Sequence, residues 1–196
     1  MGKISKLIAM AGVLGVLGIA ALPVASYAET DTDDVTVNVQ VSSTLNLVCT
    51  GNYTHNYGPA SNAADVNNGV AIGTTPTGTC AVTSNDAAGY TLTVASASTN
   101  TNLVHTVNSA LTIPTAAGLP AAGTPAWAIN VSDPQVDGTS GANWLAMPAS
   151  NATPITVATT SAAGNGSHPY SFATSIASTT ASGTYSATVR FTATSN

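Results

Sequence analysis

The sequence predicts an all-β protein: an antiparallel immunoglobulin-like β-sandwich preceded by a signal-peptide helix. Three observations lead to this prediction. The first 28 residues have the pattern of a leader for export. After them, apolar and polar residues alternate in several short runs, and turn residues separate these runs. Two cysteines lie in this second part, which suits a small exported domain stabilised by a disulfide.

The composition argues against several classes of protein. Only 6% of the 196 residues are charged, and lysine and arginine together number three, so no basic surface can neutralise the phosphates of a nucleic acid. The same scarcity of ionisable groups argues against an enzyme, because general acid–base catalysis depends on them. An apolar content of 44% argues against intrinsic disorder. We therefore expect a folded, non-enzymatic protein that does not bind nucleic acid.

Residues 1–28 are expected to be a secretory signal peptide. Two lysines precede an apolar stretch over residues 7–24, and Ser26-Tyr27-Ala28 provides the small residues of a cleavage site. The alternative is an uncleaved anchor, because the stretch has the minimum length for a membrane-spanning helix. No later stretch is long enough, so we expect no membrane span after cleavage. The remaining chain would be secreted, extracellular or on the cell surface, and in the periplasm during transit in a Gram-negative host.

Cleavage would change the charge and would leave both cysteines in the chain. All eight acidic residues follow residue 28, where Arg190 is the single base, so residues 29–196 carry a net charge of −7. We interpret residues 29–196 as one β-sandwich domain. In an oxidising compartment, Cys49 and Cys80 are most simply one disulfide. The alternative is a reactive thiol or a metal site, which neither a CxxC motif nor a histidine at ligand spacing supports.

The first strand signal begins at Val35. From there to Cys49, odd positions are predominantly apolar and even positions polar, which predicts an extended strand with one apolar face. Residues 29–48 are therefore interpreted as an N-terminal strand, continuous or broken near Ser42-Ser43. Its first valines could pair with the domain's own sheet or be donated to a neighbouring chain. These candidate strand-exchange residues are Val35, Val37, Val39 and Val41.

Six further strand signals follow, each bounded by glycine, proline or asparagine. They are residues 90–94, 103–113, 127–131, 155–157, 170–176 and 185–193. Residues 52–79 and 114–126 contain few large aliphatic side chains and are expected to form long surface loops. Several short strands in one exported domain favour an antiparallel sandwich.

Motifs for chemistry are scarce. The sequence contains no GxSxG, HExxH, P-loop or GxGxxG pattern, so we expect no catalytic residue, cofactor or resident metal. Asp133 and Asp137 could hold a calcium ion in a turn, although their spacing is not that of an EF-hand loop. His105 lies in an alternating run and is interpreted as structural.

Aromatic residues give an alternative function. Trp144 lies in a turn-like context, and with Tyr53 and Tyr57 it could line a concave face on which sugars stack. Trp127 alternates with aliphatic residues and is interpreted as part of the core. On this alternative the protein is a secreted carbohydrate-binding module with glycans as its partners.

The order of features resembles that of bacterial fimbrial subunits and their spore-coat-protein-U-like relatives. In those proteins a cysteine follows an alternating N-terminal strand, and a second cysteine opens a later strand. The corresponding stretches here are Val35–Val41, Cys49, Tyr57-Gly58, Cys80-Ala81-Val82-Thr83, Gly89-Tyr90-Thr91-Leu92-Thr93-Val94 and Gly183-Thr184-Tyr185. The chain is also similar to WxL-type surface domains of Gram-positive bacteria, with Trp127-Ala128-Ile129 nearest to their Trp-x-Leu motif.

The fimbrial resemblance implies an incomplete sandwich whose groove receives the N-terminal strand of the next subunit. It implies a non-enzymatic cell-surface protein with a structural or adhesive role, forming pilus-like assemblies with itself or with other surface proteins. On physical grounds the valines allow the same mode of binding, and they equally allow closure within the chain's own sheet. The backbone of an added strand pairs with a sheet edge, while alternate side chains enter pockets.

Overall fold

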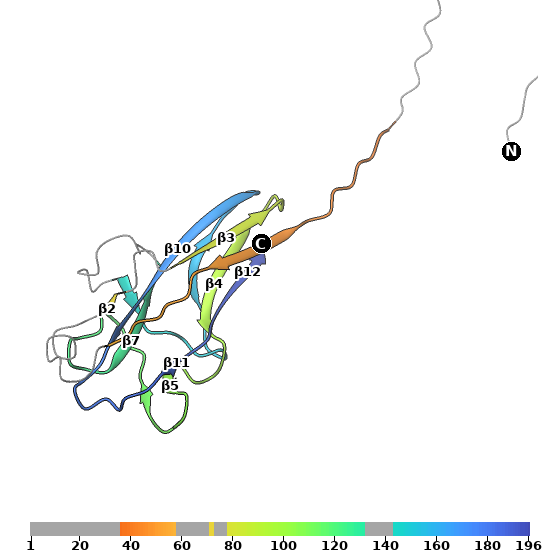
Figure 1. Ribbon diagram of the computed structural model, residues 1–196. Coiled ribbons are helices and arrows are strands. Elements are labelled where there is room, and N and C mark those ends of the chain that lie inside the picture. The colour runs from red at the N-terminus through yellow and green to blue at the C-terminus, as the bar shows by residue number, and fades with distance from the viewer. Residues whose placement is uncertain (1–35, 58–70, 73–77, 132–142) are drawn as a thin grey trace, which may run out of the picture. The chain divides into compact units, whose positions relative to one another are not determined.

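The computed structural model describes residues 36–57, 71–72, 78–131 and 143–196 (Figure 1). By its internal contacts the chain divides into two units, Met1–Gln40 and Val41–Asn196, and all described strands belong to the second. The predicted signal peptide and Val35 lie outside the described residues. Within the described part, no helix is long and apolar enough to cross a membrane.

The larger sheet has six antiparallel strands. In spatial order they are β1 (Leu45–Thr50), β3 (Gly78–Ser84), β10 (Gly164–Ser175), β7 (Ala126–Asn130) and β8 (Trp144–Leu145), and β2 (Ala71–Ile72) also pairs with β10. The first part of β10 pairs with β3, and its last part pairs with β7 and β2. This 12-residue strand therefore links the two ends of the sheet.

Two smaller antiparallel sheets complete the fold. In one, β4 (Tyr90–Ser96) lies between β12 (Val189–Ser195) and β9 (Ile155–Thr159); in the other, β5 (Leu103–His105) lies between β11 (Tyr185–Ser186) and β6 (Thr112–Ile113). The all-β, antiparallel prediction is confirmed at this level. The predicted strand at residues 90–94 is confirmed with its alternation, since Tyr90, Leu92 and Val94 are buried and the intervening threonines are half-buried.

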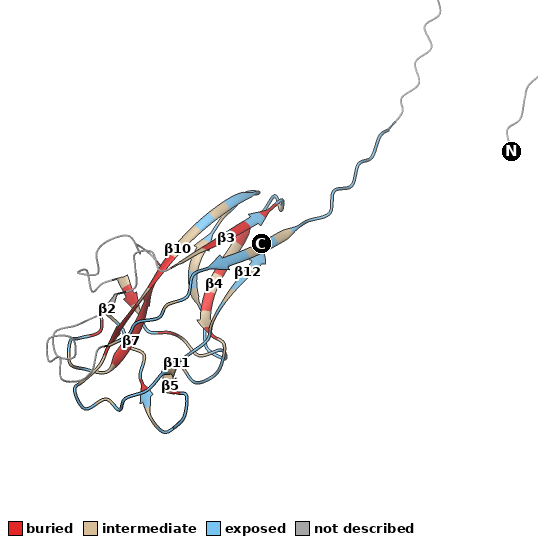
Figure 2. Cartoon of the chain, in the orientation of Figure 1, coloured by how far each residue is buried: buried red, intermediate tan, exposed pale blue. Residues whose placement is uncertain are grey.

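The core lies where β3 and β10 of the large sheet contact β4 of the second sheet. Val82, Leu92, Ile129 and Tyr170 are each at most 4% exposed and belong to one cluster. Figure 2 shows the buried residues concentrated in β3, β4, β7 and β10. Burying a side chain of this size contributes roughly 1.5–3 kcal/mol, so these four strands supply much of the stability.

One hydrogen bond crosses this core between the sheets. The hydroxyl of Tyr90 on β4 lies 2.7 Å from Nε2 of His168 on β10, and the two rings meet edge-on. A Cβ atom at Gly166 would collide with the Tyr90 hydroxyl, so glycine is required there for the bond to form. Burial lowers the pKa of His168 and raises that of Tyr90, which favours the neutral form of both groups.

Several predicted strands are shorter than expected or divided. Residues 103–113 form two short strands and a turn, because Nδ1 of His105 accepts hydrogen bonds from the backbone N–H groups of Val107 and Asn108. A side-chain acceptor at this position gives the backbone an alternative to the sheet ladder. The run over residues 185–193 is likewise divided, between β11 and β12. His105 has the structural role that its sequence context indicated.

The expected strand over residues 29–48 requires the largest correction. Among the described residues 36–44 there is no strand, and β1 begins only at Leu45. The reason lies in its neighbour: Leu45 is paired with Ser84, the last residue of β3, after which the chain turns. An extended segment preceding Leu45 therefore has no partner in β3, whatever its own alternation.

Candidate site of strand assembly

β1 and β12 are the open edges of the two sheets that contact the core. Among the described residues, β1 pairs only with β3 and β12 only with β4. Their inward-facing side chains, including Leu47 and Phe191, are half-buried, whereas those of β3 and β4 are fully buried. Figure 2 shows the same contrast along the two edge strands. Unpaired edges of this kind present backbone donors and acceptors to another strand.

A groove of about 360 Å³ lies between these two edges. Its lining comes from β1, from the start of β12 and from the residues beside them: Leu47, Cys49, Ala97, Thr188, Val189, Arg190 and Phe191. Most of this lining is apolar. The groove can therefore accept small aliphatic side chains from a strand that pairs with either edge.

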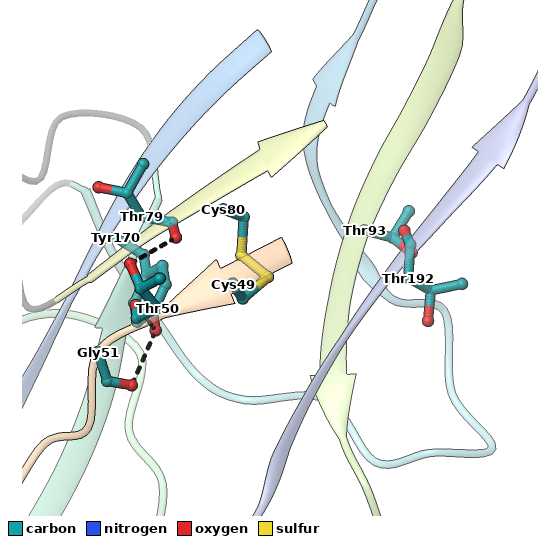
Figure 3. Close-up of a disulfide and its surroundings, with 8 residues drawn as sticks. All are labelled: Cys49, Thr50, Gly51, Thr79, Cys80, Thr93, Tyr170 and Thr192. Atoms are coloured by element: carbon teal, nitrogen blue, oxygen red, sulfur yellow. Dashed lines mark hydrogen bonds between the residues drawn. A yellow bond between two sulfur atoms is a disulfide. The ribbon is translucent and has the colours of Figure 1, made fainter. Parts of the chain in front are cut away.

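The disulfide joins β1 to β3, and its residue Cys49 also lines the groove. Cys49 and Cys80 are directly opposite in the β1–β3 ladder and are bonded, as the sequence predicted. Figure 3 shows the bridge with Tyr170, whose hydroxyl donates to the carbonyl oxygens of Thr50 and Gly51 at 2.9 and 3.3 Å. In the chain-entropy model, closing this loop contributes roughly 3.5–4 kcal/mol. β1 is thus fixed to β3 while its second edge stays available.

β12 is held at its far end by the last residue of the chain. The side chain of Asn196 donates hydrogen bonds to the carbonyl oxygens of Ala88 and Thr160 at 3.2 and 2.7 Å, and it accepts one from the hydroxyl of Thr91 at 2.8 Å. These bonds join the end of β12 to the turns before β4 and after β9. Both strands that border the groove are therefore held in place by other parts of the fold.

The described valines of the N-terminal segment are strongly exposed. Val37, Val39 and Val41 are 80%, 81% and 78% exposed, respectively. Large apolar side chains with this degree of exposure, at every second position, are unusual on a protein surface. Within the described part of the chain, residues 36–44 form no strand, and the outer edges of β1 and β12 pair with none.

Opposite charges accompany the groove and, in the sequence, the valine segment. Arg190 is exposed near the start of β12, lines the groove, and is the only lysine or arginine after residue 28. In the sequence, Asp31, Asp33 and Asp34 come directly before the first valine, outside the described residues. One base beside the groove and three acids beside the valines are electrostatically complementary.

The structure does not support the glycan interpretation of Trp144. Its side chain is only 3% exposed and packs with Ala128 and Ala173, because β8 adds to the larger sheet beside β7. A sugar cannot stack on a ring that the fold covers. The turn-like sequence around Trp144 gave no sign of this pairing, which depends on a strand 14 residues earlier in the chain.

Tyr53 and Tyr57 lie together, and both are engaged with β10. Each hydroxyl is 2.9 Å from the hydroxyl of Thr174, and the ring of Tyr53 packs against Phe172. Burial raises the pKa of Tyr53 to about 12. Both side chains are half-buried, so they stabilise the segment after β1 against the sheet and offer little open surface to a ligand.

The proposed calcium ligands Asp133 and Asp137 lie outside the described residues. Within the described ranges, no three histidine, cysteine or acidic side chains come together as a metal site would require.

No protein-family model matches the chain, and no curated protein matches its sequence.

Sequence reasoning identified the inward face of each edge strand but not the groove itself. Leu47, Val189 and Phe191 were predicted to face inward, yet alternation cannot show that an inward face remains half-covered. The sequence Asn85-Asp86-Ala87-Ala88-Gly89 is typical of a turn and indicates no other role for Asn85. Its further contacts, described below, depend on which segment passes beside that turn.

Proposed function

We propose that the protein is a secreted, non-enzymatic bacterial cell-surface protein with a structural or adhesive role: a pilus-like subunit that assembles by strand exchange. In this proposal the domain is an incomplete immunoglobulin-like sandwich. Residues 35–41 of one copy occupy the groove between β1 and β12 of another copy. The observation that carries the proposal is the coexistence of that open groove with the exposed, alternating valines.

The energetics favour strand addition over a looser contact. Burying four valines would contribute on the order of 6–10 kcal/mol before ordering costs. Association itself costs about 4–15 kcal/mol, so side-chain burial alone does not guarantee a stable complex. Backbone hydrogen bonds to the free edge of β1 or of β12 would supply the remainder, and they require an extended donor segment. Leu47 and Phe191, now half-buried, would gain cover at the same time.

Charge complementarity sets the direction of the donated strand. The acidic residues lie at its N-terminal end, and Arg190 lies near the start of β12. The two meet only if the donated strand runs parallel to β12. The disulfide is consistent with the oxidising compartment, outside the cytoplasm, in which this assembly would take place.

The experiment places the same charges on the two faces of the segment. Val37→Arg with Val39→Arg disrupts the apolar face, and Asn38→Arg with Gln40→Arg is the matched control on the polar face. The full chain, expressed with its leader, is recovered after export and sized by light scattering. We expect multimers for the wild type and the control and monomers for the valine variant. Multimers of wild-type size in the valine variant would overturn the proposal.

A further inference from the structure

Asn85 joins the turn after β3 to the residues that precede β1. Its backbone N–H donates to the carbonyl oxygen of Thr44 at 3.2 Å, and its side-chain oxygen accepts from the N–H of Thr44 at 2.5 Å. Its side-chain nitrogen donates to the carbonyl oxygen of Ser42 at 3.0 Å. We call these three hydrogen bonds the Asn85 clamp. All of its atoms belong to the unit Val41–Asn196.

The clamp extends the β1–β3 ladder beyond the end of both strands. The last ladder pair is Leu45 with Ser84, so Thr44 and Asn85 are the next pair in register. The side-chain amide of Asn85 has the donor and acceptor of a peptide group, and it continues the pairing as far as Ser42. Residues 42–44 are therefore held beside the β3–β4 turn, in line with β1.

The turn holds Asn85 without help from residues 42–44. The N–H of Asp86 donates to the hydroxyl of Ser84, and the side chain of Asp86 accepts from the N–H of Ala88. The N–H of Gly89 donates to the carbonyl oxygen of Asp86 at 3.0 Å. Asn85 thus belongs to a turn that has hydrogen bonds of its own.

Self-closure of the groove would need a different path for the same residues. To lie against the free edge of its own β1, the segment 35–41 must reverse direction within Ser42-Ser43-Thr44. A hairpin loop of this length needs a residue in the left-handed region, normally glycine or asparagine, and neither occurs there. The loop would also break the clamp's bonds to Ser42 and Thr44.

We infer that the Asn85 clamp commits residues 35–41 to the groove of a second copy of this chain and prevents them from closing their own. This inference rests on the proposed function, in which the groove accepts this segment. It adds what directs the segment to that partner: the clamp keeps the segment from folding back, so the strand is donated between molecules. Asn85 acts as a positioning residue and does not itself contact the groove.

The test weakens the clamp and supplies the missing turn. Asn85→Ala removes the two side-chain bonds, and Ser42→Asn with Ser43→Gly introduces a strong hairpin sequence. The control is Asn108→Ala, which removes a similar turn asparagine that bonds only locally, to the N–H of Ala110. Each full chain is exported from its host, and two quantities are measured: the monomer fraction by light scattering, and the hydrogen-exchange protection of residues 36–44 in the monomer.

We expect the triple variant to raise the ratio of monomer to multimer about tenfold above that of Ser42→Asn with Ser43→Gly alone, because the two side-chain hydrogen bonds of Asn85 each shift the equilibrium a few-fold. In those monomers residues 36–44 should be protected, while wild-type monomers and the control remain unprotected. An unchanged ratio in the triple variant, or monomers without protection, would overturn the inference.

A wild-type chain that never forms multimers would instead contradict the proposed function. In that case the hydrogen-exchange protection of residues 36–44 alone decides whether the inference holds. Protection that appears only in the triple variant supports a clamp that blocks self-closure, and protection already present in the wild type overturns it.

Discussion

The two sides of the domain differ in how completely they are closed. On the side of β3, β10 and β4, side chains such as Val82 and Leu92 are fully buried, and the Tyr90–His168 bond crosses between the sheets. On the side of β1 and β12, equivalent inward positions such as Leu47 and Phe191 are half-buried beside an open groove. The same alternation in sequence thus gives fully buried inward side chains on one side and half-buried inward side chains on the other.

Under the proposed function, this difference would separate stability from assembly. The closed side contains the filled core, and the disulfide fixes β1 to it. The open side can then remain incomplete without unfolding the domain. Strand exchange needs both properties, because a subunit must stay folded before its partner arrives.

Replacing a leucine with alanine on each side tests the difference between the two sides most directly. Leu92→Ala should cost about 3–5 kcal/mol in the free energy of unfolding, because it leaves a cavity in a filled core. Leu47→Ala should cost about 1 kcal/mol, because its side chain is already half in water. Denaturant unfolding with the disulfide intact measures both. Equal losses would mean that the open side is as well packed as the closed side.

Removing the disulfide should have the next largest effect. Cys49→Ala with Cys80→Ala should cost roughly 3.5 kcal/mol, because the unfolded chain regains the freedom of the closed loop. Hydrogen exchange should rise most in β1, which would keep its ladder to β3 and the hydrogen bond from Tyr170 to Thr50. Exchange that rises uniformly across β3, β4 and β10 would contradict a disulfide that serves the edge strand.

Acidification should weaken the closed side. Burial lowers the pKa of His168 below its ordinary value of 6.5, so between these two values the unfolded chain binds more protons than the folded one. The contribution of His168 to the free energy of unfolding is therefore fully present above about pH 6.5, and it is lost as the pH falls below that value. His168→Gln should remove part of this decline. The matched control is His55→Asn, which replaces an exposed histidine.

The smallest expected effect concerns charge at the open side. Arg190→Glu should weaken assembly by a factor of about 2–5, because an exposed ion pair contributes about 0.2–1 kcal/mol. The loss should shrink at high salt, and Asp31→Lys with Asp33→Lys should restore assembly. Sedimentation at two salt concentrations measures how far each variant assembles. An effect that salt does not change would exclude the electrostatic explanation.

The sequence predicted those features that depend on neighbouring residues or on cysteine pairing. The alternation over Tyr90–Val94 placed each side chain on its correct face, and a single cysteine pair left one simple disulfide. Both predictions are confirmed. Turn signals also separated most strands, because glycine and proline act locally.

Other features depend on distant partners and could not be read from the chain. The strand expected from Val35 begins at Leu45 because β3 ends opposite that residue. Trp144 is buried because β8 joins β7, and residues 103–113 turn because the ring of His105 accepts backbone hydrogen bonds. The groove is of the same kind, since it depends on which edges are left unpaired.

The most direct measurement is a cross-link from the valine segment. A photoreactive residue replaces Val39 in the full chain, and isotopically light and heavy chains are exported separately, mixed, assembled and irradiated. We predict mixed light–heavy cross-links from position 39 to β1 or β12, at Leu47, Val189 or Phe191. Cross-links confined to single chains, or absent from these two strands, would contradict the account.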